Sequence, residues 1–273
     1  MARTPTGSDQ TALITGASSG IGEALARQFA AAGFNLVLVA RNSGKLKLLA
    51  AALAEEHGVK AWVAPADLAL PGAAQALAAK MKRARRRIDV LVNNAGILEH
   101  GAFVDMATPR HRELIDLNVT ALSEMLAVFV PPMVAHGQGR VLNVASIAAF
   151  QPVPLLATYA ATKAFVLSLT ESLAEELQGT GVTVTVLCPG ITATSMLDKA
   201  QQASAELGGL PSFVVGTADA VAHEGFKACM QGKVICVPGT LNLAATVAGR
   251  ATPRWLLRRV GGAVVRRLKP PRP

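Results

Sequence analysis

The sequence contains a single tyrosine, Tyr159, whose neighbours make it a candidate for proton chemistry. Lys163 follows four residues later, so on a helix the phenol and the ammonium would share one face. A nearby cation makes a phenol lose its proton more readily than its ordinary pKa of about 10 implies. Such a phenol can exchange a proton with a carbonyl or an alcohol. The same spacing also occurs as a solvated pair on helices, so other features must decide.

The elements that would position this pair follow an alternating pattern. The 273 residues suit one large domain, and 51% are apolar, which allows a sizeable core. Short apolar runs alternate with helical segments, which predicts an α/β fold with a Rossmann-type, doubly wound parallel sheet of about seven strands and helices on both faces. The expected strands are 11–15, 35–40, 59–63, 88–92, 140–146, 182–187 and 233–237. The expected helices are 23–32, 44–57, 73–87, 109–130, 158–177 and 218–231.

A glycine-rich turn, 16–22, lies between the first expected strand and the first expected helix. That context is typical of dinucleotide binding, because glycines let the backbone approach a pyrophosphate and the helix N-terminus offers free N–H groups. A tight turn without a ligand would show the same composition. The candidate cofactor residues in this turn are Gly16, Ser18, Ser19, Gly20, Ile21 and Gly22.

Residues at the end of the second strand bear on the choice of cofactor. Ala40 supplies no acid for the ribose hydroxyls of NAD, whereas Arg41 offers a guanidinium suited to a 2′-phosphate. We therefore expect NADP(H) to be preferred over NAD(H), although a solvated arginine at a strand end is the alternative. Asp67 and Leu68 follow the third strand, where Asp67 could reach the adenine or serve as a helix N-cap.

Further candidates follow the later strands, and ligands in open α/β sheets lie beyond the carboxyl ends of strands. Ser146 ends the fifth strand, thirteen residues before Tyr159. Asn118 lies inside an expected helix, where asparagine is unfavourable, which hints at a specific bonding role. The loops after the fourth and sixth strands add the candidates Asn94, Ala95 and Gly96, and Pro189, Gly190, Ile191 and Thr192.

We expect the chain to divide into one Rossmann-type domain, 1–240, which would bind the cofactor and carry the catalytic residues, and an apolar, basic extension, 241–273. Weak periodicity over about 192–215 predicts a substrate lid. After Glu224 the sequence holds ten basic residues and no acidic one, so the net charge of +9 describes the extension and not a nucleic-acid-binding domain. An amphipathic stretch is expected over 255–268. We favour its packing on the body or on a second subunit over binding an anionic membrane surface.

Composition also limits location and metal binding. No run of eighteen uncharged apolar residues appears, and the first residues lack the apolar core of a signal peptide. Cys188, Cys229 and Cys236 fit no metal-binding spacing, so we expect no metal and buried, reduced cysteines in a cytoplasmic protein.

Together these features resemble the short-chain dehydrogenase/reductase family. The resemblance covers about residues 10–240 and is carried, in order, by the segments 15–22, Asp67, 93–96, Asn118, Ser146, Tyr159 with Lys163, and 189–190. Arg41 resembles the NADP-preferring subgroup of the family.

The resemblance implies a role for each catalytic candidate. Tyr159 would be the general acid in reduction, and Lys163 would lower the pKa of Tyr159 and bind the nicotinamide ribose. Ser146 would polarise the substrate carbonyl, and Asn118 would position a water that links Lys163 to solvent. The resemblance also implies a homodimer or homotetramer.

Three functions follow from these expectations. The first is an NADPH-dependent carbonyl reductase or alcohol dehydrogenase acting on an apolar ketone, aldehyde or acyl chain, if the apolar segment Phe150–Leu156 and the lid residues Met196 and Leu197 line the pocket. The second is a 3-oxoacyl thioester reductase whose basic patch, Arg83–Arg87, docks an acidic carrier protein. The third is a non-catalytic NADP-binding sensor or scaffold.

Overall fold

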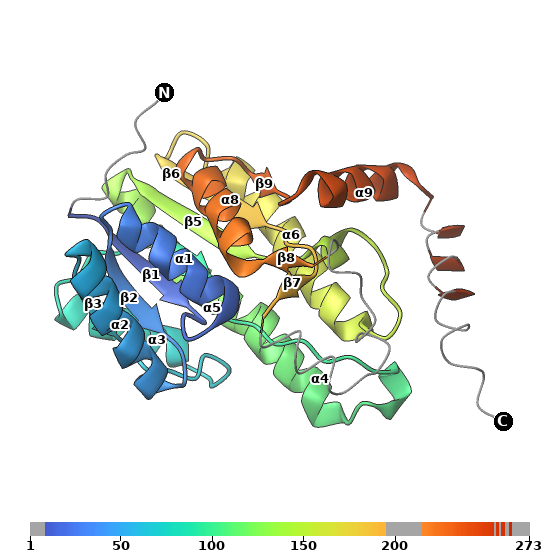
Figure 1. Ribbon diagram of the computed structural model, residues 1–273, viewed down its shortest axis with the longest axis horizontal. Helices are drawn as coiled ribbons and strands as arrows, with labels where there is room; N and C mark the ends of the chain where they lie inside the picture. The colour runs from blue at the N-terminus through green and yellow to red at the C-terminus, as the bar shows by residue number, and fades with distance from the viewer. Residues whose placement is uncertain (1–8, 195–214, 254, 257, 260–261, 264–273) are drawn as a thin grey trace.

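A computed structural model describes residues 9–194, 215–253, 255–256, 258–259 and 262–263 of the chain (Figure 1). Its main feature is a seven-stranded parallel sheet in the order β3-β2-β1-β4-β5-β6-β9. The number of strands and their parallel arrangement confirm the sequence prediction. The strands are β1 (Thr11–Thr15), β2 (Asn35–Val39), β3 (Ala61–Val63), β4 (Val90–Asn93), β5 (Gly139–Val144), β6 (Val182–Leu187) and β9 (Ile235–Cys236).

Helices cover both faces of this sheet, because alternate strand residues point to opposite sides. One apolar core joins the sheet to α1 (Gly20–Ala31), α2 (Ser43–His57) and α8 (Ala218–Met230). A second core joins the other face to α3 (Ala73–Arg83), α5 (Ala121–His136) and α6 (Ala157–Glu176). The two cores confirm a doubly wound architecture.

The order of the strands places a topological switch between β1 and β4. From β1 the chain continues outward through β2 to β3, and it returns to pair β4 with the other side of β1. The connections that follow β1 and β4 run in opposite directions along the sheet. In folds of this kind, such a switch leaves a crevice at the carboxyl ends of the two strands, where ligands bind. The turn after β1 and the turn after β4 lie on either side of this point.

Two helical segments differ from the expectations. The helix expected at 73–87 ends at Arg83, and Arg85 has a left-handed backbone with φ of 48°. Residues beyond Arg83 therefore belong to a turn, in which the Arg86 guanidinium lies 3.7 Å from the centre of the Trp62 ring and Arg87 pairs with Asp89 at 2.7 Å. Part of the expected basic patch is thus engaged with the body of the protein.

The long helix expected at 109–130 is interrupted. It consists of α4 (Thr108–Ile115), a π-helical turn η2 (Asp116–Thr120) and α5. The continuous run Thr108–His136 is long and apolar enough to cross a bilayer by length and composition alone. Residues along α5, including Met125 and Phe129, are buried in the second core, so we interpret this run as a core helix of the domain.

Smaller elements complete the described residues. Helical turn η1 (Phe103–Asp105) follows β4, and η3 (Ile147–Phe150) follows β5. Strands β7 (Thr192–Ala193) and β8 (Gly216–Thr217) form a separate parallel pair. Most of the expected lid, 195–214, lies outside the described residues. Helix α9 (Thr240–Ala251) begins where the extension was predicted to start, and the division into domains stays a prediction.

The three cysteines are free and buried, as predicted. Burial raises the pKa of Cys188 and Cys229 to about 12. Among the residues that the structure describes, no cluster of His, Cys, Asp and Glu side chains could hold a metal ion.

Candidate active site

The predicted site residues come together at the carboxyl edge of the sheet. The turns after β1, β4, β5 and β6 carry Gly16, Asn94, Ser146 and Gly190, and these four strands are consecutive neighbours in the sheet. Parallel strands that end side by side bring their following residues to one edge. The sheet thus gathers residues that are far apart in the sequence.

The turn between β1 and α1 has the backbone form that its glycines allow. Gly16 and Gly20 have φ of 67° and 58°, in the left-handed region that disfavours other residues. A Cβ on Gly22 would collide with the Gly16 carbonyl oxygen and the Asn94 amide, so this helical position requires glycine. The turn includes Ser18, and Ile21 lies in the first turn of α1.

The N-terminus of α1 keeps its backbone donors available. Ser19 is the N-cap of α1, yet its side chain makes no capping hydrogen bond. The first N–H groups of a helix have no intrahelical acceptor, and they carry the positive end of the helix dipole. This end of α1 therefore suits the phosphate of a dinucleotide.

Thr15 holds the β1 and β4 turns together, and sequence reasoning did not include it among the site residues. Its Oγ1 accepts from the N–H of Asn94 at 2.9 Å and the N–H of Ala95 at 3.0 Å. The same hydroxyl donates to the carbonyl oxygen of Val92 at 3.2 Å. Its place at the end of the first strand, just before Gly16, was the signal that could have identified it.

The two asparagines after β4 have different roles. Asn94 donates its amide to the carbonyl oxygen of Thr15 at 2.9 Å and so fixes the turn. Asn93 instead donates to the side-chain oxygen of Asn143 at 2.9 Å, and Asn143 donates to Thr170 Oγ1 at 3.0 Å. Asn93 therefore belongs to a buried polar chain that ties β4 and β5 to α6.

Arg41 lies at the end of β2 with its side chain 67% exposed. Its guanidinium is 3.9 Å from the Asp67 carboxylate, a loose ion pair that leaves most of its donors available. Asp67 also accepts from the Ala69 N–H at 3.1 Å, so it shapes its own turn. The alternative of Asp67 as a helix N-cap is wrong, because Gly72 caps α3. The Leu68 side chain is buried in the core, which leaves its backbone for a ligand.

The half-buried Ser146 and the buried Tyr159 and Lys163 lie together between the end of β5 and α6. Tyr159 and Lys163 are 8% and 6% exposed, and the phenol shares a hydrogen bond with the Ser146 side chain. The Lys163 ammonium lies 5.7 Å from the centre of the Tyr159 ring and donates to the carbonyl oxygen of Val144 at 2.9 Å. One face of α6 thus presents phenol and ammonium together, as predicted.

Burial dominates the ionisation of this cluster. It raises the pKa of Tyr159 to about 12, and the hydrogen bond with Ser146 acts in the opposite direction. It also lowers the pKa of Lys163 to about 8. Desolvation of the phenolate outweighs the Ser146 hydrogen bond, and the expected lowering of the phenol pKa by Lys163 stays a prediction.

Asn118 lies within the π-helical turn η2 and not in a regular helix. Its Oδ1 accepts from the Ile97 N–H at 2.9 Å, and its Nδ2 donates to the Ile97 carbonyl at 3.0 Å and to Thr162 Oγ1 at 3.1 Å. Single π turns are frequent at functional sites. A Cβ on Gly96 would lie 3.0 Å from Asn118 Oδ1 and 3.5 Å from Lys163 Nζ, so the β4 turn, η2 and α6 meet here.

The loop after β6 closes another side of the site. The carbonyl oxygen of Pro189 accepts from the Ile147 N–H at 2.9 Å, which ties this loop to the segment that follows Ser146. Thr192 Oγ1 donates to the Gly190 carbonyl at 3.0 Å. A Cβ on Gly20 would lie 3.0 Å from Thr194, so the chain beyond this loop approaches the glycine-rich turn.

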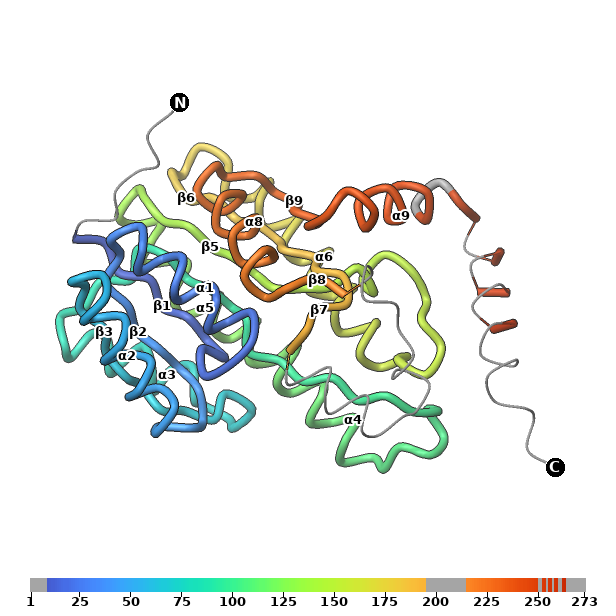
Figure 2. The backbone as a smooth tube through the Cα atoms, viewed as in Figure 1, coloured from blue at the N-terminus to red at the C-terminus, as the bar shows by residue number. Residues whose placement is uncertain are grey.

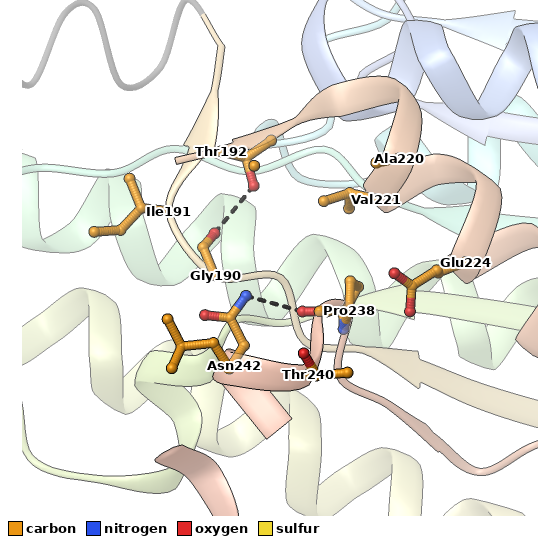
Figure 3. A pocket seen from close by; sticks show the side chains of 12 residues that line it. Gly190, Ile191, Thr192, Ala220, Val221, Glu224, Pro238, Thr240 and Asn242 are labelled. Carbon is orange, nitrogen blue, oxygen red and sulfur yellow. Dashed lines mark hydrogen bonds between the residues drawn. The ribbon is translucent and has the colours of Figure 1, made fainter. Parts of the chain in front are cut away.

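A cavity of about 240 Å³ lies beside this loop (Figure 3). Gly190, Ile191 and Thr192 line one side of it, and α8 and the connection from β9 to α9 line the other. Ser146, Tyr159 and Lys163 are absent from its lining. The cavity therefore borders the predicted cofactor loop but is not the catalytic pocket.

Apolar side chains surround the phenol. Tyr159 packs in a small cluster with Leu114, Ala148 and Ala160. The partly buried neighbours of this cluster are Ile97, Leu98, Met106, Val153 and Leu156. Two of them belong to the apolar segment that sequence reasoning assigned to the substrate pocket, whereas Met196 and Leu197 lie outside the described residues.

The fold and this edge of the sheet define an α/β protein in which a glycine-rich turn and a buried tyrosine lie at the same edge of a parallel sheet. Residues 10–205 match the family model described as short chain dehydrogenase. Nodulation protein G from Rhizobium sp. (strain N33) is 34% identical over 240 residues, which cover 85% of this chain and 96% of that protein. The chain belongs to the short-chain dehydrogenase family, which is a family of oxidoreductases.

Solved structures agree with this assignment. A short-chain dehydrogenase from Sphingobium yanoikuyae in complex with NADPH is 35% identical, with a TM-score of 0.78 and 96% of both chains covered. A short-chain dehydrogenase/reductase from Burkholderia phymatum in complex with NAD is 26% identical, with a TM-score of 0.77, 88% of this chain covered and 92% of the other. Structural neighbours therefore include proteins that hold either nicotinamide cofactor.

Proposed function

We propose that this protein is an NADP(H)-dependent oxidoreductase that interconverts an apolar carbonyl compound and its alcohol by hydride transfer. The cluster of Ser146, Tyr159 and Lys163 beside the apolar residues around Leu156 carries the proposal. A hydroxyl, a phenol and an ammonium in one desolvated place suit the protonation of a carbonyl oxygen.

The residues at the sheet edge fit the cofactor. The close approach of Gly22 to Gly16 and Asn94 leaves a backbone surface without side chains, and the uncapped start of α1 presents N–H groups for the pyrophosphate. Gly96 leaves similar room beside Lys163 and Asn118. NADPH, when bound, supplies the hydride, while the protein orients the substrate and moves the proton.

Tyr159 would donate its proton to the substrate oxygen. An alkoxide that develops on reduction is far more basic than a phenolate, so a phenol with a pKa of about 12 can still protonate it. Ser146 would hold the same oxygen, and Lys163, which is protonated below its pKa of about 8, would stabilise the phenolate left behind. Oxidation of the alcohol needs the phenolate first and should therefore accelerate as pH rises.

The substrate class follows from the surroundings of the phenol. The side chains of Ile97, Met106, Val153 and Leu156 would favour a carbonyl on an apolar frame. A 3-oxoacyl thioester on a carrier protein is the second enzymatic candidate. Two of its predicted docking residues, Arg86 and Arg87, are engaged with Trp62 and Asp89, which weakens that candidate.

The test of the function is loss of NADPH absorbance with a panel of apolar ketones, aldehydes and free or carrier-linked 3-oxoacyl thioesters, with NADH in parallel. We expect turnover of apolar carbonyls with NADPH. Tight NADPH binding without turnover of any member of the panel would favour a sensor or scaffold instead. Faster turnover of the carrier-linked thioester would favour the fatty-acid type of reduction.

The preference for NADPH would come from Arg41, whose exposed guanidinium can bind the 2′-phosphate. Replacing Arg41 by alanine should lower kcat/KM for NADPH by about tenfold or more and leave that for NADH nearly unchanged, because a charge-assisted hydrogen bond contributes about 1.5–3 kcal/mol. Arg27→Ala, which removes an arginine paired with Glu23 on the surface of α1, is the matched control. Equal losses for both cofactors in the Arg41 variant would refute this role.

A further inference from the structure

Helix α9 turns a polar face toward the body of the protein and exposes its large apolar side chains. Asn242, Thr246 and Gly249 recur at intervals of four and three residues, so they share one face. This face is the one turned inward, since Thr246 is buried and the other two are partly buried. Leu241, Leu243 and Val247 are 61%, 49% and 59% exposed. An ordinary surface helix has the opposite arrangement.

Contacts on the inner face fix the position of α9. The Asn242 amide donates to the Pro238 carbonyl at 2.8 Å, and a Cβ on Gly190 would lie 2.6 Å from that amide nitrogen. Near the other end of the helix, a Cβ on Gly249 would lie 3.6 Å from the Gln151 side-chain oxygen. α9 also contacts η3, the turn after Ser146. The helix is thus attached to the wall of the candidate active site.

The outer face of α9 exposes large apolar side chains. Figures 1 and 2 show α9 leading away from β9, beyond the sheet. No charged side chain is found among its exposed described positions, which are Thr240, Leu241, Leu243, Ala244, Ala245, Val247 and Ala248. Shortly after the helix, Trp255 and Leu256 are 55% and 39% exposed. Apolar residues gathered in this way mark a surface that another body covers.

The positive charge beside this apolar face favours a lipid surface over a second copy of the chain as its partner. Arg258 and Arg259 are exposed next to Trp255, with the Arg259 guanidinium 5.6 Å from the ring centre. From residue 225 onward the sequence holds ten basic residues and no acidic one. A two-fold contact with a second copy would bring two such basic segments together, whereas anionic lipid headgroups would neutralise them.

We propose that α9 and the described residues shortly after it, from Trp255 to Arg259, bind the surface of an anionic lipid bilayer. Leu243, Val247 and Trp255 enter the boundary between headgroups and acyl chains, and Arg258 and Arg259 contact the lipid phosphates. Because the inner face of α9 contacts the loop after β6 and the turn after Ser146, bound protein holds its active-site wall next to the lipid. An apolar substrate dissolved in the membrane would then have a short path to the site.

The test is co-sedimentation of the full chain with vesicles of phosphatidylcholine containing phosphatidylserine, and with vesicles of phosphatidylcholine alone. We expect binding to the anionic vesicles to be about tenfold or more tighter and to weaken with salt, since basic residues are attracted to the negative surface and salt screens this attraction. Fluorescence of Trp255, followed in a Trp62→Phe background, should shift to the blue on binding.

Two variants and one control make the test specific. Leu243→Glu combined with Val247→Glu should reduce vesicle binding by about tenfold or more, because charges at the boundary are costly. Arg258→Glu combined with Arg259→Glu should do the same. Leu48→Glu, at a 75% exposed leucine on α2, should bind vesicles like the wild type. NADPH affinity, measured in each variant, checks that the Rossmann core remains folded.

Three results would overturn the proposal. The first is no binding to anionic vesicles. The second is equal binding to both kinds of vesicle, which would exclude the role of charge. The third is sedimentation of the lipid-free protein as a dimer that Leu243→Glu with Val247→Glu dissociates, while vesicle binding stays unchanged; a second copy would then cover the face. These measurements do not depend on turnover, so they stand apart from the test of the proposed function.

Discussion

Helices α6 and α9 both turn polar side chains toward the body, and they differ in what covers their apolar residues. In α6 the buried Lys163 and Thr170 lie on the same face as the buried Val166 and Leu167. The polar groups find partners such as the Val144 carbonyl and the Asn143 amide. In α9 the inward face is small and polar, and the leucine and valine side chains face outward.

This difference in packing gives the two helices different roles in the molecule. The core holds α6 strongly, so its buried phenol and ammonium can keep a costly desolvated geometry that apolar packing offsets. α9 contacts the body through a small polar face and leaves its large apolar side chains exposed.

Tyr159→Phe tests whether the polar face of α6 is catalytic. The substitution keeps the ring that packs against Leu114 and removes only the proton donor. Turnover of the best carbonyl substrate should fall by about 10²–10⁴-fold, as for loss of a general acid, while NADPH affinity stays the same. Ser172→Ala, which removes an exposed hydroxyl from the same helix, should leave turnover unchanged. Near-normal turnover in the phenylalanine variant would refute the role of Tyr159.

The same substitution on the two helices measures how strongly the core holds each of them. Leu167→Ala on α6 removes a side chain that is 6% exposed and should lower the free energy of unfolding by about 2–5 kcal/mol. Leu243→Ala on α9 should lower it by less than about 0.5 kcal/mol. Urea unfolding of both variants gives the two values. Equal losses of free energy would mean that Leu243 is packed as well as Leu167, which would contradict the difference between the two helices.

The ionisation of the phenol tests the burial of the α6 face. Because Tyr159 is the single tyrosine, phenolate absorbance reports on it alone. An ordinary phenol is about half ionised at pH 10, whereas a pKa raised to about 12 leaves about one in a hundred ionised. Chain unfolded in urea at the same pH is the control and should be about half ionised. Half ionisation in the folded protein would show that the phenol is solvated.

The same shift has a consequence for stability. A phenol whose pKa is raised by folding contributes stability that is present below pH 10 and is lost as the pH rises through about 12. Lys163 acts in another range, because its pKa is lowered from 10.5 to about 8. Burial of protonated Lys163 destabilises the folded state fully below pH 8, and this destabilisation disappears as the pH rises toward 10.5. The two contributions therefore change with opposite sign.

Periodicity and spacing in the sequence predicted most of the scaffold. Runs such as 11–15 and 182–187 are strands with the predicted bounds, because short runs of apolar and β-branched residues between turns favour the strands of a buried parallel sheet. The glycine-rich turn and the pair of Tyr159 and Lys163 were also recognisable, since backbone freedom and helical spacing are local properties.

Other features depended on contacts that no local pattern contains. The π turn at Asn118 arises where the chain bonds Ile97 across the site, and the hydroxyl of Thr15 matters because β4 ends beside β1. The helix end at Arg83 and the pairing of Arg86 with Trp62 also required the fold.

The sequence by itself determined the order of most strands and helices and the residue types that can do chemistry, because these depend on nearest neighbours along the chain. Only the tertiary structure decided the ionisation of the buried groups and the exposure of the side chains. It raised the pKa of Tyr159 through burial, and it turned the apolar side of α9 outward. Both outcomes depend on which distant segments exclude water from a side chain, and solvent exclusion is a property of the packed molecule.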